Sequence, residues 1–135
     1  MTAIRRRLRD DRGVATTQLV LVVPVLLLLA MLVVQFALVW HARHIAQYAA
    51  ARGLAAARTK DGTAAGGRAQ ARRSLTALGS RILTAPSVAV DRTTTQTTVR
   101  VRGTVMAVAP GLHLHASGTA AGPTERLTAP GGGRP

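Results

Sequence analysis

The chain has 135 residues, a formal net charge of +13 and no cysteine. The missing cysteine excludes a disulfide framework and thiolate metal sites. The basic charge suits anionic lipid, nucleic acid or an acidic protein surface. However, Ala, Arg, Gly and Thr dominate the sequence. We therefore attribute most of the positive charge to this general amino-acid bias and not to a binding function. The chain has no nucleic-acid-binding motif, and residues 49–135 contain no aromatic side chain that could stack on a base, so nucleic acid is not an expected partner.

Residues 1–13 form a basic leader with five arginines, and an uncharged apolar segment follows. The stretch from Leu19 to Trp40 is 22 residues long, and a helix needs about 20 to cross a bilayer core. We therefore predict a single transmembrane helix over residues 19–40, with Pro24 tolerated near its start. A cleaved secretory signal is the alternative, although its apolar region is usually only about 7–15 residues long.

Basic residues are denser in the leader than in the flank directly after Trp40, which opens with His41, Arg43 and His44. Short basic flanks stay in the cytoplasm, so we expect the N-terminus inside and the C-terminal domain outside the cytoplasmic membrane. Trp40 and Tyr48 suit the outer interface, where amphipathic aromatic rings collect.

The predicted helix continues beyond the membrane to Arg58, because residues 42–58 are rich in Ala, Gln and Arg. Ile45, Ala49, Gly53 and Ala56 recur at helical spacing on one face. Such small side chains let a second helix approach closely. The same composition also fits a plain alanine-rich stalk with no partner. The domain that we predict here covers residues 14–58.

Residues 59–121 form the predicted extracytoplasmic domain, and a Gly-rich turn over residues 60–67 opens it. A second helix is predicted over residues 68–83, where Ala71, Leu75, Leu78 and Ile82 form an amphipathic stripe. Pro86 is expected to end the helical part of this domain.

Alternating residues then predict a small antiparallel sheet. Val88 and Val90 belong to the first strand, residues 99–107 to the second, and residues 112–116 to the third, with a turn over residues 92–96. The fold class is therefore α+β: a long N-terminal transmembrane helix, a second amphipathic helix and a small antiparallel sheet, a pilin-like layout. Residues 122–135 form a Pro/Gly-rich tail.

The sequence predicts neither a catalytic site nor a bound cofactor. Its five acidic residues are widely separated, apart from the pair Asp10 and Asp11 in the leader. The histidines occur in two pairs without a nearby acid, so we expect no metal site. A basic set in the distal domain could contact an anionic polymer: Arg68, Arg72, Arg73, Arg81, Arg100 and Arg102.

One local layout has a more specific meaning. A short basic leader is followed by Gly13, and an apolar helix follows after Gln18. Together with the run from Asp11 to Val20, Pro24 and the Ala- and Arg-rich stretch 46–58, this resembles the TadE-like family, the pseudopilin-like proteins of Tad/Flp pilus systems. The late segment 122–127 also looks like the end of that family.

This resemblance implies a prepilin-peptidase cleavage between Gly13 and Val14, and a pilin-like helix-packing role for Gln18, Pro24, Ala49, Gly53 and Ala56. Family members usually carry Glu where this chain has Gln18, and in the pilin scheme that acid neutralises the N-terminal amine of a neighbouring subunit. Gln18 supplies no such charge. Alternatively, Gly13 and Gln18 simply mark the start of the helix, with Thr16 or Thr17 as its cap.

The leading hypothesis is a membrane-anchored, TadE-like pseudopilin-like protein, not an enzyme, that acts in assembly of a Tad-type pilus or related secretion apparatus. Its implied partners are membrane lipid, other pilin-like or Tad pilus assembly proteins, and a prepilin peptidase. The alternative is a membrane-tethered basic module that binds nucleic acid or an anionic cell-envelope polymer, with an affinity that falls steeply with salt.

Overall fold

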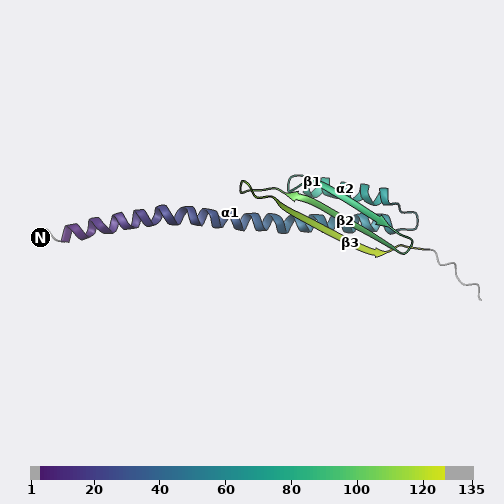
Figure 1. Ribbon diagram of the computed structural model, residues 1–135, viewed down its shortest axis with the longest axis horizontal. Helices are drawn as coiled ribbons and strands as arrows, with labels where there is room; N and C mark the ends of the chain where they lie inside the picture. The colour runs from purple at the N-terminus through teal and green to yellow at the C-terminus, as the bar shows by residue number, and fades with distance from the viewer. Residues whose placement is uncertain (1–3, 127–135) are drawn as a thin grey trace, which may run out of the picture.

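The computed structural model describes the backbone of residues 4–126 and the side chains of residues 16–126. The predicted α+β fold is confirmed (Figure 1). The chain forms two helices and three strands in this order: α1 (Ile4–Arg58), α2 (Ala64–Gly79), β1 (Leu83–Arg92), β2 (Gln96–Val105) and β3 (Leu114–Pro123). Residues 1–3 of the predicted leader and 127–135 of the predicted tail lie outside the described residues.

Helix α1 is 55 residues long and contains Pro24 without ending there. It begins at Ile4, not at Val14 as predicted, so Thr16 and Thr17 lie inside the helix and do not cap it. The physical reason is that the leader is rich in Arg, which is a good helix former, and the single Gly13 costs only about 1 kcal/mol. At about 1.5 Å per residue the helix is roughly 80 Å long.

Helix α2 starts and ends four residues earlier than predicted. The Oγ1 atom of Thr63 caps it by accepting a hydrogen bond from the amide of Gly66 at 2.9 Å. The predicted stripe is partly wrong, because Leu78 is 53% exposed and Ile82 lies beyond the helix end. Ala71 and Leu75 are buried as expected.

The sheet is antiparallel, with strand order β1-β2-β3. Pro86 does not end a helix but lies within β1, where the pairing with β2 shifts between Thr84 and Ser87. Proline is tolerated at such a bulge on an edge strand. Ala85 in this bulge has a φ of 46°, a backbone conformation that residues other than glycine rarely adopt.

One face of the sheet packs against the second half of α1 and against α2, so the two helices form one layer and the sheet the other (Figure 1). The core consists of small and medium side chains, and α1 contributes many of them: Ala42, Ile45, Ala46, Ala49, Ala50 and Ala57. The globular part of the protein therefore includes the second half of α1 as well as residues from 59 onward.

Two polar side chains also tie the sheet to α1. The amide of Gln47 pairs with the backbone of Thr119 in both directions, at 2.9 and 3.1 Å. Arg92 donates to the carbonyls of Ala57 and Thr59 at the end of α1, at 2.8 and 3.2 Å. A cation at that position satisfies the free carbonyls and suits the helix dipole.

Strand β3 crosses α1 at Gly118, where the two backbones are in direct contact. A Cβ atom at this position would overlap the backbone of Ala46 and Gln47. At Gly122 in the same strand, a Cβ would meet the Leu54 side chain at an ordinary 3.5 Å.

We expect Gly118→Ala to destabilise the domain by about 1–3 kcal/mol, because backbone atoms can move away only by displacing β3 from α1. Thermal unfolding of the full chain in detergent micelles measures this change. Gly122→Ala is the matched control and should unfold at nearly the wild-type temperature. Equal melting temperatures for the two variants would contradict the close crossing.

Candidate functional site

Helix α1 has two parts with different surroundings. From Leu19 to Val34 its apolar side chains are exposed on every side of the helix, for example Leu21 at 68% and Leu28 at 66%. After Gln35 one face is covered by the rest of the domain. The first part has no protein neighbour other than the β2–β3 loop, residues 106–113, within the part of the chain that the structure describes (Figure 1).

Gln35 marks the boundary between the two parts. Its side chain is 2% exposed and is the first buried one along the described side chains of α1. Nε2 donates to the carbonyl of Met106 at 3.3 Å, and Oε1 accepts from the amide of Val108 at 2.8 Å. An amide in an apolar helix is costly unless it is paired, and this pairing joins the β2–β3 loop to α1. The sequence showed Gln35 only as a polar interruption of the apolar segment.

An apolar groove lies between the β2–β3 loop and α1. It has a volume of about 770 Å³, and Gln35 is its polar end. Its walls come from both elements: Val25, Leu28, Leu29, Met31, Leu32, Gln35, Ala109, Pro110 and Leu112.

Of the small residues expected to pack against a helix, Gly53 faces α2 of the same chain. A Cβ on Gly53 would lie 2.9 Å from the carbonyl oxygen of Gly67 and 3.0 Å from the Cβ of Ala71. Ala49 is fully buried, whereas Ala56 is only half-buried and its neighbour Ala57 takes the buried position. A helix of a second chain would therefore have to use another part of α1.

The residues of the predicted processing site lie inside α1. Gly13 and Val14 are helical, in the part of α1 for which only the backbone is described. Gln18 and Pro24 lie further along the helix, and both are exposed. Any role of Gln18 and Pro24 in packing therefore concerns lipid or another molecule.

The arginines predicted to contact a polymer lie in two layers. Arg68 on α2 is half-buried, and Arg72 and Arg73 on the same helix are exposed, as is Arg81 just beyond its end. The side chains of Arg100 and Arg102 project from β2 on the face of the sheet opposite the buried valines. The structure thus divides this basic set between the helix layer and the outer surface of the sheet.

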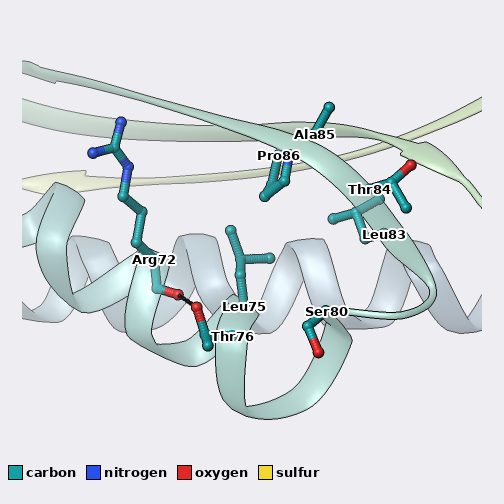
Figure 2. Close-up of a pocket in the computed structure, with 8 residues that line it drawn as sticks. All are labelled: Arg72, Leu75, Thr76, Ser80, Leu83, Thr84, Ala85 and Pro86. Carbon is teal, nitrogen blue, oxygen red and sulfur yellow. Dashed lines mark hydrogen bonds between the residues drawn. The ribbon is translucent and has the colours of Figure 1, made fainter.

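A second cleft lies between α2 and the bulge of β1, with a volume of about 490 Å³ (Figure 2). Its lining consists of Arg72, Leu75, Thr76, Ser80, Leu83, Thr84, Ala85 and Pro86. The hydroxyls of Thr76 and Thr84 donate to backbone carbonyls, at 3.1 Å each. Arg72 is the only charged side chain of this cleft, so the lining supplies no acid–base pair for catalysis.

Residues 16–126 hold no group of three or more His, Asp or Glu side chains placed to bind a metal ion. His44 bonds to the carbonyl of Trp40 at 3.1 Å and stacks on its ring. Glu125 makes a long, exposed ion pair with Arg58, at 4.0 Å. These polar groups have structural partners, so the apolar half of α1 and the adjoining groove are the main candidate for a functional surface.

A helix of this length and composition, with a mean hydropathy of 3.0 over its most apolar part, fits a single-pass membrane protein. The family model for TadE-like proteins matches residues 13–54, which confirms the resemblance seen in the sequence. The match covers less than half of the chain, and all of it lies within α1. No curated protein and no solved structure matches the chain. The TadE-like segment points to Tad pilus systems, and hence to pilus assembly proteins as partners.

We expect Gln35→Leu to loosen the β2–β3 loop, because it leaves the Met106 carbonyl and the Val108 amide without partners. The cost should be about 1–3 kcal/mol. Hydrogen exchange at the Val108 amide in the full chain measures the effect, which should be a clear increase in rate.

Gln47→Leu is the control for this experiment, because it removes a similar two-way amide pair from an exposed site. Water can replace that pair, so the cost should be smaller and the exchange at Val108 unchanged. Unchanged exchange at Val108 in Gln35→Leu as well would show that Gln35 does not hold the loop.

Proposed function

We propose that the chain is a membrane-anchored, TadE-like pseudopilin-like protein that acts in the assembly of a Tad-type pilus or a related secretion apparatus. The observation that carries this proposal is the position of the family match. It covers the exposed apolar part of α1 and continues to Leu54, where the helix is packed against the domain. The matched segment therefore includes both the proposed anchor and the platform for the domain.

The exposed side chains of α1 support the anchoring. Large apolar residues from Leu19 to Val34 meet no protein atoms on most sides, and in water this surface would be strongly unfavourable. Lipid removes that cost. The arginines of residues 1–13 favour retention of the N-terminus in the cytoplasm, which would put the sheet and α2 on the outer side.

Contacts with other pilin-like helices would use the first part of α1. Gly53 packs against α2 and Ala49 is buried in the core, whereas the apolar side chains of residues 19–34 are exposed and open to a neighbour within the bilayer. Because Gln18 carries no charge, it cannot neutralise the terminal amine of an adjacent subunit. We therefore propose a minor component or assembly factor of the pilus, not its main polymerising subunit.

Deletion of the gene should abolish pilus assembly and adherence, and the wild-type gene should restore both. Complementation with the triple variant Leu27→Arg, Leu28→Arg and Leu29→Arg should fail. Each arginine near the bilayer centre costs about 2.5–3.5 kcal/mol on insertion, so three together outweigh the gain from the remaining apolar residues of the span. The measurements are membrane fractionation and a count of pili by electron microscopy.

Leu78→Arg is the matched control, since Leu78 is an exposed leucine on α2 and not in the proposed span. It should remain in the membrane fraction and restore the pili. Normal piliation in the deletion strain would contradict the proposed role. Normal membrane retention of the triple variant would contradict the anchor.

We also propose that a prepilin peptidase cuts between Gly13 and Val14. The bond lies inside α1, and a peptidase must unwind the helix locally to reach it; Gly13 lowers that cost by about 1 kcal/mol relative to alanine. The mature protein from native membranes should then begin with Val14, and Gly13→Leu should keep the leader. N-terminal sequencing decides the question, since a wild-type chain that begins with Met1 or Thr2 would identify an uncleaved anchor.

A further inference from the structure

We propose that the β2–β3 loop inserts into the leaflet next to the domain, beside α1, so that the protein meets the bilayer through two segments. This inference rests on the proposed membrane anchoring and adds a second lipid-binding surface to it. The loop projects from the sheet back along α1 toward the N-terminus (Figure 1). In this arrangement a lipid acyl chain fills the apolar groove between the β2–β3 loop and α1.

The composition of the loop supports this insertion. From Gly103 to Leu112 the chain has no charged residue. Met106 is 49% exposed, and Val108 and Leu112 are each 38% exposed. The loop therefore presents apolar side chains at the protein surface. Exposed loops are usually polar, and an apolar surface of this kind marks a contact with another phase or molecule.

The position of the loop along α1 supports it further. The hydrogen bonds of Gln35 hold the loop five residues before Trp40. Five residues correspond to about 8 Å along a helix. Trp40 is 70% exposed and stacks on His44, which suits a place among the lipid headgroups. With Trp40 at that level, the attachment of the loop to Gln35 lies about 8 Å deeper, at the boundary between headgroups and acyl chains. The tip of the loop lies beside Leu32, eight residues before Trp40, and so reaches about 12 Å below it, among the acyl chains.

Several backbone polar groups of the loop are already hydrogen-bonded, as an apolar environment requires. Unpaired backbone groups cost several kcal/mol each in hydrocarbon. Gln35 pairs the carbonyl of Met106 and the amide of Val108, and the amide of Met106 donates to the carbonyl of Ile82 at 2.9 Å. Pro110 at the tip has no amide hydrogen to satisfy. This pairing explains why a glutamine occupies the end of an otherwise apolar segment.

The groove favours lipid over a soluble partner. One of its walls consists of Val25, Leu28 and Leu32, which belong to the proposed span, and its other wall is the apolar tip of the loop. A water-soluble protein cannot reach a wall that lies within the bilayer. In the proposed arrangement acyl chains surround this part of α1. One of them can fill an apolar groove whose one polar lining side chain, Gln35, is already hydrogen-bonded to the loop.

The experiment uses the absence of native cysteine to place single labels on the full chain. Val108→Cys labels the loop, Leu27→Cys labels the far side of the span, and Ala89→Cys labels the exposed surface of β1. Each variant carries an environment-sensitive fluorophore and is reconstituted into vesicles of phosphatidylethanolamine and phosphatidylglycerol. Two sets of lipids act as quenchers, one with a nitroxide near the top of the acyl chain (shallow) and one with a nitroxide near its end (deep). Circular dichroism verifies that each variant is folded.

We expect a blue-shifted emission with strong quenching by the shallow nitroxide at position 108, a blue-shifted emission with strong quenching by the deep nitroxide at position 27, and neither signal at position 89. Quenching at 27 without quenching at 108 would overturn the loop insertion and leave the anchor intact. No quenching at either position would overturn the anchor itself. Before labelling, an efficient disulfide cross-link between two Val108→Cys chains in the vesicles would show that a second copy occupies the groove, and would also overturn the proposal.

Discussion

The second half of α1 has a face of alanines with one glycine, Gly53, and the rest of the domain packs on this face. Small side chains let β3 and α2 approach the helix until backbone atoms are in contact, at Gly118 and at the pair Gly53 and Gly67. Packing at this distance gains many weak contacts per residue, which compensates for a core without aromatic side chains. The sheet has only three strands and would be marginal alone, so it requires this helix.

This requirement ties the domain to the anchor. A small domain could be attached to a membrane helix by a flexible linker, but here the same helix supplies both the core and the apolar segment. Pro24 does not interrupt it. At Gln35, within one helical turn, α1 passes from the exposed apolar part to the part that is packed against the domain. The side chain of Gln35 hydrogen-bonds the Met106 carbonyl and the Val108 amide of the loop.

Much of the fold could be predicted from local patterns, because the span depends on length and hydropathy and the strands depend on alternation. The start of α2 was missed since Gly66 and Gly67 indicate a turn, whereas Thr63 caps a helix and Gly67 fits against Ala57. The role of Gln35 could not be predicted, because its partners lie more than 70 residues away in the sequence. Contacts of that kind depend on tertiary packing alone.

A continuous helix also determines how the protein can respond to its neighbours. In the proposed membrane arrangement, a lateral contact would act on side chains 19–34. Because α1 is continuous and the domain packs on it, a change in the tilt of α1 would move the sheet and α2 with it. The loop beside Gln35 resists such a change, since tilting α1 moves an apolar tip relative to the lipid boundary. In the proposed arrangement, helix and loop together therefore restrict the orientation of the domain more than a single span could.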